Sequence, residues 1–544
     1  MSSRFAEKHD KTSRRYHISM SRAHTFIAQT CLGVLLHLDK NITSHGLEEF
    51  PLAEYAAQHW FEHAHLEGVS QHAVELVEGI KQLFDCTKPH LSIWLWIHDP
   101  TMPPWKSHER AEGPSPPCGT PLHYAAFCGI HVIAKMLAIE HPQGVNSQSF
   151  DEASTPLHLA SENGHVDLAQ MLAEHGADLS AQKKDRSTAL HLASRDGRVD
   201  LMRMLVDRGA DMSAQKDWGS TALHLASRNG HVDLAQMLVD RGADMSVQEE
   251  TGSTALHLAS ENGHIDLARM LVERGADVSA QMEGGWTALH YASRGGHVDL
   301  ARMLVERGTN MSAQDKDGST ALHLACFYGR VDLARMLMER GANVSAQNND
   351  GWTALHFVSC NGHVDLARML IERGADASAL EKVGGTALHL ASRYGHVDLA
   401  RMLVERGANM SAQVDNEWTA LHLASENGHV DLARMLVENG ADVSALQKDR
   451  WTALHLASKN GHVDLARMLV ENGANVSAQE EDGWTALHFV SHSGHVDLAQ
   501  MLVERGADVS AQNKDGWTAL HLALDNGHAD LAKMLVKRNT DMAP

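Results

Sequence analysis

The chain has 544 residues, a net charge of −22, 43% apolar residues and 21% charged residues. It is too long for one hydrophobic core, so several domains or a repeat array are expected. Its strong acidity opposes binding to phosphate backbones, so nucleic acid is not an expected partner.

The N-terminal stretch MSSRFAEKHDKTSRRYH is charged and lacks a secretory apolar core. The most apolar stretch, residues 26–38, contains Gln29, Thr30 and His37 and is too short to span a bilayer. The six cysteines show neither zinc-finger spacing nor a disulfide framework and are expected to be reduced thiols. These features predict an intracellular protein, cytoplasmic in the simplest case, without membrane insertion.

Residues 1–99 differ in composition from the rest and contain apolar helical patterns. We expect helices over residues 21–38, 52–66, 70–84 and 91–98. Six of the twelve prolines then fall within residues 100–117, which indicates a linker. The predicted domains are a helical region over 1–99, this linker, and a repeat array over 118–544.

The repeat array has a fixed period of 33 residues, as from Thr155 to Thr188, and it contains no insertion. A weak first copy begins at Thr120, which gives thirteen units in all. The threonines that open the other copies are Thr155, Thr188, Thr221, Thr254, Thr287, Thr320, Thr353, Thr386, Thr419, Thr452, Thr485 and Thr518.

Each copy predicts two short helices, as residues 350–380 illustrate. Thr353 is a typical helix cap, and Gly362 supplies the left-handed turn that ends the first helix. The apolar stripe of the second helix consists of Val364, Ala367, Leu370 and Ile371, widened by Leu366 and Met369. Helices this short cannot bury their stripes alone, so the copies are expected to stack into a solenoid.

The pattern T-A/P-L-H-x-A, G-H-x-D and G-A-D/N at this period resembles ankyrin repeats. The resemblance covers the chain from about Cys118 onward. It implies an all-α ankyrin-repeat solenoid of about thirteen units, each with two antiparallel helices and a β-hairpin tip. Arg198 and Arg330 depart from the pattern, because they replace the histidine of G-H-x-D.

The N-terminal segments AHTFIAQTCLGVLLHLD, FPLAEYAAQHWFEHA and LFDCTKPHLSIWLWIHD resemble the helical region that precedes ankyrin arrays in fungal NACHT-type, NLR-like sensor proteins. The phosphate-binding pattern G-x-x-x-x-G-K-[ST] occurs nowhere in the chain. Either an ATPase half is missing from this product, or the resemblance does not extend to a nucleotide switch.

Histidine is abundant, with 39 residues, mostly in the T-A/P-L-H and G-H positions. Equivalent histidines of stacked copies would lie about 10 Å apart, too far to share a zinc ion. The ankyrin resemblance implies that they bond loop backbone between copies. In the N-terminal region, His59, Glu62 and His63 form H-x-x-E-H, a short match for which solvated or packed histidines are the simpler interpretation.

Charged residues of the second helix are expected on its solvated face. Asp365, Arg368 and Glu372 lie at i, i+3 and i+7, a spacing that predicts charge pairs along this helix. We find no nucleophile–base pattern, phosphate loop or carboxylate pair, so neither enzyme activity nor a cofactor or metal is predicted.

The copies differ mainly at the loop tip and at the end of the first helix, whereas the second helix is nearly constant. The resemblance implies that these variable positions line a concave groove that holds protein ligands. The candidates for partner binding are Trp286, Trp352, Trp418, Trp451, Trp484, Trp517, Arg195, Arg228, Arg294, Phe327, Tyr328, Arg393, Tyr394 and Lys459. Aromatic residues and arginine are enriched in interface hot spots. Packing of neighbouring tryptophans against each other is the alternative.

The sequence therefore predicts a protein-interaction scaffold, the ligand-sensing part of a fungal NLR-like signalling protein. Two alternatives stay open: a passive adaptor that bridges two proteins, and a partner of a separate nucleotide-driven ATPase. The sequence determines neither the ligand nor the oligomeric state.

Overall fold

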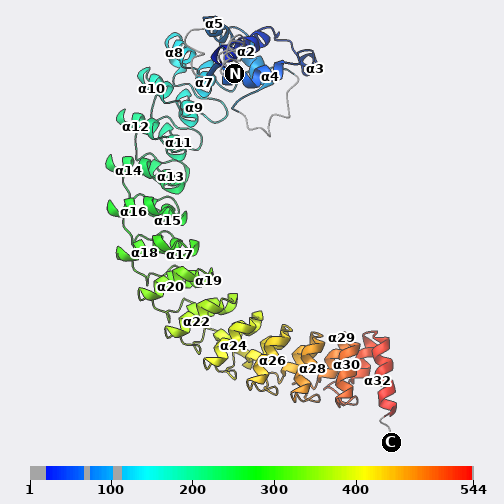
Figure 1. Ribbon diagram of the computed structural model, residues 1–544. Coiled ribbons are helices and arrows are strands. Elements are labelled where there is room, and N and C mark those ends of the chain that lie inside the picture. The colour runs from blue at the N-terminus through cyan, green and yellow to red at the C-terminus, as the bar shows by residue number, and fades with distance from the viewer. Residues whose placement is uncertain (1–19, 66–73, 102–112, 542–544) are drawn as a thin grey trace, which may run out of the picture. The chain divides into compact units, whose positions relative to one another are not determined.

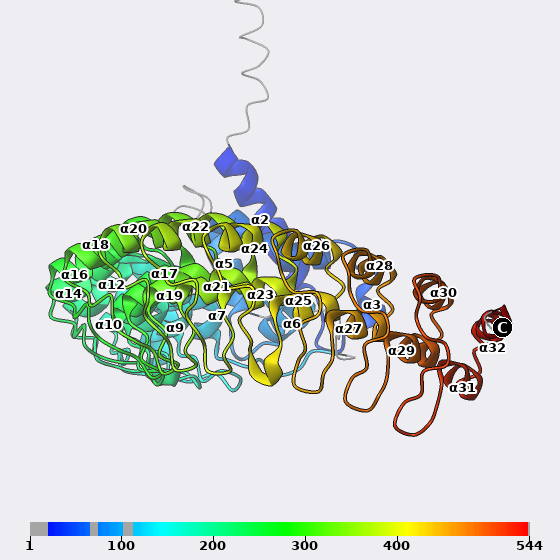
Figure 2. The ribbon, with the colours of Figure 1, turned by 90° about the horizontal axis from the view of Figure 1, so that it is seen from below.

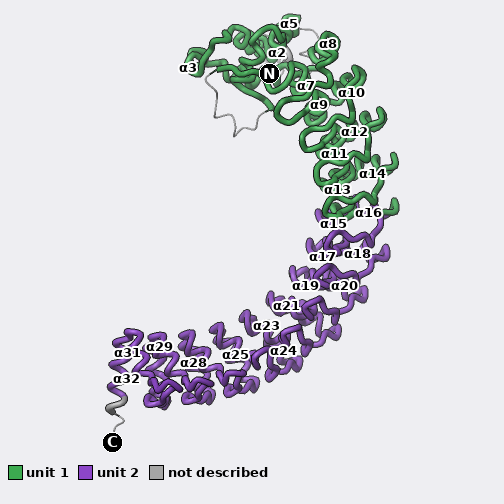
Figure 3. Tube along the Cα trace, turned by 180° about the vertical axis from the view of Figure 1, so that it is seen from behind, with its two compact units in different colours: residues 1–259, 273–276 green, residues 260–272, 277–544 purple. Residues whose placement is uncertain are grey.

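The computed structural model describes residues 20–65, 74–101 and 113–541 (Figure 1). The charged N-terminus and most of the predicted linker lie outside these residues. The chain divides into two compact units: unit 1, residues 1–259 with 273–276, and unit 2, residues 260–272 with 277–544 (Figure 3). Within the described part of the chain, no helix is both long and apolar enough to cross a membrane.

Unit 1 begins with five described helices, four of which correspond to the predicted ones, whereas α3 was not predicted. They are α2 (Met20–Leu36), α3 (Ser44–Leu47), α4 (Ala53–His65), α5 (Val74–Leu83) and α6 (His90–Ile97). The helix predicted over 70–84 is confirmed from Val74 onward, and its first residues lie outside the described part.

Aromatic residues form the core of this N-terminal region. Trp60, Phe84 and Trp94 are fully buried, and the Trp60 and Trp94 rings meet edge to face with centroids 5.4 Å apart. Trp94 Nε1 donates to the backbone oxygen of Ala57 at 2.9 Å, so the buried indole N–H is satisfied. These contacts join α4, α5 and α6 into one small core.

Helix pairs follow, in agreement with the predicted ankyrin-type architecture. Unit 1 contains α7 (Pro121–Phe127) with α8 (His131–Glu140), α9 (Pro156–Asn163) with α10 (Val166–Glu174), α11 (Ala189–Arg195) with α12 (Val199–Asp207), and α13 (Ala222–Asn229) with α14 (Val232–Asp240). The residues of α15 (Ala255–Glu261) and α16 (Ile265–Glu273) are divided between the two units.

Unit 2 continues the same pattern of pairs. It contains α17 (Ala288–Gly295) with α18 (Val298–Glu306), α19 (Ala321–Phe327) with α20 (Val331–Glu339), α21 (Ala354–Asn361) with α22 (Val364–Glu372), α23 (Ala387–Tyr394) with α24 (Val397–Glu405), α25 (Ala420–Glu426) with α26 (Val430–Glu438), α27 (Ala453–Lys459) with α28 (Val463–Glu471), α29 (Ala486–Ser493) with α30 (Val496–Glu504), and α31 (Ala519–Asp525) with α32 (Ala529–Asp541). Within the unit, each first helix packs on the next first helix.

The ends of the first helices are set by local sequence. Thr353 caps α21 in an extended conformation, and its backbone N–H donates to His356 Nδ1 at 3.1 Å. Gly362 ends the helix with φ of +76°, in the left-handed region. A side chain there would also place Cβ 2.6 Å from the ring of His396 in the next pair. Both the left-handed backbone and this close contact therefore favour glycine at this position.

The second helices share the core with the first helices, and their buried stripe is narrower than the sequence predicts. In α22, Leu366, Ala367 and Leu370 are fully buried, whereas Val364 and Ile371 are half-buried. Leu366 therefore belongs to the centre of the stripe rather than to its margin. Burial of a leucine side chain contributes roughly 2 kcal/mol, repeated in every pair.

Ion pairs join the second helices to each other, and this differs from the predicted pairing along one helix. Arg340 pairs with Glu306 of the preceding pair at 2.6 Å, and Arg505 pairs with Glu471 at 3.2 Å. Among the described residues, no carboxylate lies within 4 Å of the Arg368 side-chain nitrogens. The cross-pair geometry is favoured because the arginine that follows each of these two helices, α20 and α30, lies near the end of the preceding second helix.

The loop tips are tight turns. The β-structure within the described residues is limited to an isolated antiparallel bridge between Val414 and Trp418. The backbone N–H of Asn348 donates to the Trp352 oxygen at 3.0 Å and closes its turn. The Asn349 N–H donates to the Asp317 oxygen at 2.9 Å, which links neighbouring tips. In Figure 2 the loops of successive pairs project on one side of the helices. The described residues contain no β-strand at these tips, so the predicted β-hairpins are not confirmed.

Candidate functional site

The histidines of the T-A/P-L-H motif form the structural frame of the array. His356 is 1% exposed, accepts at Nδ1 from the Thr353 N–H, and donates from Nε2 to the Gly385 oxygen of the next pair at 3.2 Å. Burial lowers the pKa of this imidazole, so it stays neutral. Both ring nitrogens are used within the fold, which leaves none to bind a metal.

The histidines of the G-H motif also join neighbouring pairs. His396 Nε2 donates to the Cys360 oxygen at the end of the preceding first helix, at 2.9 Å. Where the sequence has Arg330 instead, its Nε donates to the Arg294 oxygen at 3.0 Å and replaces that bond. The interpretation that these positions bond backbone between copies is confirmed.

We call the surface formed by the ends of the first helices and the loop tips the first-helix face. The tryptophans before the repeat threonines border it. Trp286, Trp352, Trp418, Trp451 and Trp484 are half-buried, and Trp517 is 38% exposed. A large indole that is half covered can serve packing and partner contact at once.

These indoles rest on first helices rather than on each other. Trp286 meets Tyr291 at 5.1 Å, and Trp352 meets Phe357 at 5.1 Å. Phe489 lies between Trp451 and Trp484, with centroid distances of 4.5 and 5.0 Å. In the described residues, no ring contact joins two of the six tryptophans.

The charged candidates differ in whether a carboxylate neutralises them. Arg195 pairs with Glu162 at 3.2 Å, and Arg294 pairs with Glu261 at 2.7 Å. Arg228 Nη2 donates to both carboxylate oxygens of Glu249 at 3.0 Å. The same Arg294 guanidinium lies over the rings of Trp286 and Tyr291, 5.4 and 5.3 Å from their centroids.

Two cations have no such partner. Lys459 Nζ lies 5.0 Å from the centroid of the Trp451 ring. Neither Lys459 nor Arg393 has a carboxylate within 4 Å among the described residues, and both side chains are exposed. An exposed cation over or beside an aromatic ring is available to an anionic group of a partner.

The remaining aromatic candidates are exposed. Phe327 is 43% exposed, Tyr328 42% and Tyr394 50%. All three lie at the ends of first helices in unit 2, α19 and α23. The structure thus places them together with Arg393 on the first-helix face.

Sequence comparison of the copies missed Trp218, at a loop tip in unit 1. Its side chain is 70% exposed, and its φ of +69° lies in the left-handed region that favours glycine or asparagine. The sequence does contain a signal: residues 216–220 read K-D-W-G-S, whereas residues 316–319 of a later copy read K-D-G-S, without the tryptophan. An exposed indole on a strained turn indicates a contact residue rather than a packing residue.

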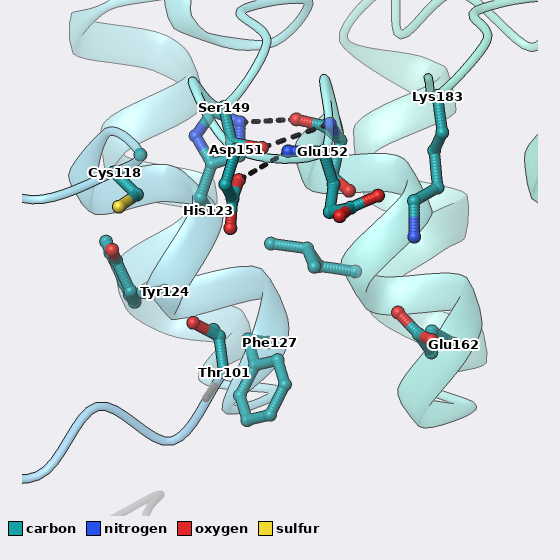
Figure 4. Close-up of a pocket in the computed structure, with 13 residues that line it drawn as sticks. Thr101, Cys118, His123, Tyr124, Phe127, Ser149, Asp151, Glu152, Glu162 and Lys183 are labelled. Atoms are coloured by element: carbon teal, nitrogen blue, oxygen red, sulfur yellow. Dashed lines mark hydrogen bonds between the residues drawn. The ribbon is translucent and has the colours of Figure 1, made fainter. Parts of the chain in front are cut away.

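A cavity of about 230 Å³ lies in unit 1 where α7 and α9 meet the preceding loops (Figure 4). Asp151 and Lys183 reach from one side toward Phe127 and Glu162 on the other. Burial and the Asp151 carboxylate both raise the pKa of the Cys118 thiol, so it stays protonated and is a weak nucleophile.

The base that the same cavity offers is already engaged. His123 Nε2 donates to the Ser154 oxygen at 2.9 Å, and its Nδ1 accepts from the Thr120 N–H at 3.0 Å. Burial lowers the pKa of His123 and raises that of the Tyr124 hydroxyl. The cavity therefore lacks an available nucleophile–base pair.

The H-x-x-E-H residues of α4 point to different partners. His59 Nδ1 contacts Glu62 Oε2 at 2.9 Å, whereas His63 Nδ1 lies 2.7 Å from His24 Nδ1 and its Nε2 3.1 Å from the Tyr55 hydroxyl. The described residues contain no group of three or more histidine, cysteine or acidic side chains arranged to hold a metal. The arrangement is that of packed helix histidines.

Paired helices, Thr caps, bridging histidines and a variable first-helix face define a helical-repeat binding protein. The family profile "Ankyrin repeats (3 copies)" matches six successive segments: 122–216, 190–282, 278–348, 341–414, 408–480 and 473–543. These matches cover most of the chain, which therefore belongs to the ankyrin-repeat family.

Two curated proteins are similar over shorter segments. The azaphilone pigments biosynthesis cluster protein L of Monascus ruber is 32% identical over 183 residues, 31% of this chain and 37% of that protein. Alpha-latrocrustotoxin-Lt1a of Latrodectus tredecimguttatus is 40% identical over 62 residues, 11% of this chain and 4% of the toxin. The chain thus spans well under half the length of either relative.

Proposed function

We propose that this chain is a protein-recognition module whose first-helix face holds a protein ligand. The observation that carries the proposal is the exposure of Phe327, Tyr328 and Tyr394 on a face whose buried frame is constant. Ankyrin-repeat membership supports a protein as the ligand, and the net charge of −22 argues against nucleic acid. We place the module in the cytoplasm.

The proposal extends to a sensor of the fungal NLR-like type. In this scheme the helical region over 1–99 passes ligand binding to a signalling partner, through the linker over 100–117, and the array over 118–544 is the sensing part. The N-terminal sequence segments and the similarity to a Monascus ruber protein support it. A passive adaptor would instead bind its N-terminal partner equally with and without ligand.

The chain is proposed to be no enzyme. It lacks the Walker-type phosphate loop, and the groups in its cavity are already bonded or protonated. Purified chain should hydrolyse no ATP above background, and clear turnover would contradict this. A separate ATPase partner would show itself as nucleotide-dependent co-purification.

The deciding experiment is capture from fungal lysate on the intact chain and on the triple variant Phe327→Ala, Tyr328→Ala, Tyr394→Ala. A protein retained by the first and lost by the second, at unchanged helicity, supports the proposal. Equal retention would move the binding site away from these residues.

The six repeat tryptophans changed to serine form a second variant that separates binding from packing. Since five of them are half-buried, we expect this variant to lose thermal stability as well as ligand. Loss of ligand at full stability would make the indoles contact residues only.

A further inference from the structure

Three successive first helices of unit 2, α19, α21 and α23, end in a patch of side chains that are exposed except for the half-buried Cys360. We define the α19–α23 patch as Phe327, Tyr328, Cys360, Asn361, Arg393 and Tyr394. The Phe327 ring is held edge-on between Tyr328 and Phe357, with centroids 4.9 and 5.8 Å away and interplanar angles of 89°. A ring held on two sides loses little freedom when a ligand covers its third side.

Hydrogen bonds between pairs fix the spacing of the patch. Asn361 Nδ2 donates to the Phe327 oxygen at 3.0 Å, and His396 Nε2, just after α23, donates to the Cys360 oxygen at 2.9 Å. Adjacent packed helices lie about 10 Å apart, so the patch extends over roughly 20 Å from α19 to α23. About six residues of an extended peptide cover that length.

The charge of the patch differs from that of the surrounding chain. From α17 to α23 the last two residues of the first helices include Arg294 and Arg393 but no carboxylate, whereas the flanking copies carry Glu261 and Glu426. Arg294 is neutralised by Glu261. Arg393 is exposed, and among the described residues it forms no ion pair. It therefore supplies the patch with an unneutralised positive charge.

We propose that the α19–α23 patch binds a short segment of a partner protein that carries a carboxylate beside apolar side chains. The carboxylate pairs with Arg393, and the apolar side chains cover Phe327, Tyr328 and Tyr394. A charge-assisted pair with arginine, next to aromatic area, is the combination that anchors interfaces. This inference rests on the proposed function and names the chemistry of its ligand.

The test uses a displayed library of random twelve-residue peptides, selected on the intact chain. We expect the bound pool to be enriched in Asp and Glu and in Leu, Ile, Phe and Trp. Arg393→Glu should weaken the best acidic peptide about tenfold or more and shift a new selection toward Lys and Arg. Arg401→Glu is the matched control, because Arg401 is exposed on α24 of the same pair, and it should leave the affinity unchanged.

Tyr394→Ala should also weaken the acidic peptide, while hydrogen exchange should show protection at the ends of α19 and α23. A basic pool, equal losses in the two arginine variants, or protection confined to unit 1 would overturn the inference. Self-association of the chain that Arg393→Glu abolishes would overturn it too, because a second copy would then occupy the patch. If the triple variant Phe327→Ala, Tyr328→Ala, Tyr394→Ala captures the same lysate protein as the intact chain, that result counts against the proposed function instead.

Discussion

The first-helix faces of the two units use the same frame in different ways. In unit 1 the arginines at this face are neutralised within the fold, as Arg195 is by Glu162 and Arg228 by Glu249. In unit 2 the face carries exposed aromatic side chains, and Arg393 lacks a carboxylate partner among the described residues. At the ends of its first helices, one repeat scaffold therefore holds neutralised arginines in unit 1 and exposed aromatic side chains in unit 2.

The residue before the repeat threonine also differs between the two units. In unit 1 it is mostly serine, and the Ser220 hydroxyl donates to Glu249, which holds that carboxylate against Arg228. In unit 2 it is mostly tryptophan, whose ring can pack on an aromatic residue, as Trp352 does on Phe357. Serine thus supports an ion pair through its hydroxyl, whereas tryptophan adds apolar area, as Trp286 does beside the pair of Arg294 with Glu261.

The largest expected effect tests what the two faces share, the buried histidines. Burial lowers the pKa of His158 and His191 in unit 1, and of His389 and His455 in unit 2, to about 4. Because the unfolded chain titrates near 6.5, each histidine stabilises the fold above that pH and loses its contribution as pH falls toward 4. We expect losses of about 3 kcal/mol for each group.

Circular dichroism between pH 7.5 and 3.5 measures this loss. His455→Gln should flatten the pH dependence, while His521→Gln, at an exposed site in the last pair, should not. Full helicity at pH 4 would show that the buried histidines do not limit stability.

The second effect concerns the tryptophans of unit 2. Trp451→Ala should destabilise its pair by about 2 kcal/mol, because the ring contacts Phe489 and carries Lys459. Trp517→Ala should cost less than about 1 kcal/mol, since that indole is more exposed. Hydrogen exchange in α27 and α31 measures both losses of stability. Equal losses for the two variants would mean that covering the indole with residues of the next copy does not add to stability.

A gain in stability is expected in unit 1. Trp218→Gly should stabilise the fold by about 1 kcal/mol, because glycine accepts the φ of +69° without strain. Gly219→Ala is the matched control and should destabilise by about 1 kcal/mol, since its φ is +75°. Urea midpoints measure both changes. A loss on Trp218→Gly would show that the indole packs.

The smallest effect compares the two kinds of arginine directly. Arg195→Gln should lower stability by up to about 0.5 kcal/mol at low salt, because its pair with Glu162 is a surface one. Arg393→Gln should leave stability unchanged. The difference should vanish in about 1 M salt, where surface pairs are screened, and a persistent difference would point to packing instead.

Most of the fold follows from the sequence. The Thr caps, the glycine stops and the second-helix stripe are local features, and repetition at a fixed period makes each copy confirm the others. For the N-terminal region, the sequence predicted the helices α4, α5 and α6 but not the aromatic core between them. The contacts of Trp60 with Phe84 and Trp94 join residues that are far apart in the chain.

By itself, the sequence determined the helix pairs, the family and the variable positions, because these depend on neighbours within one copy. Tertiary structure decided which of the variable side chains are available. Trp484 and Trp517 share the surrounding G-W-T-A-L-H, yet Trp484 is half-buried and Trp517 is exposed, because burial depends on what the adjacent copy places beside the ring. The partners of the arginines were likewise decided across copies, through contacts such as that of Arg340 with Glu306 in the preceding copy.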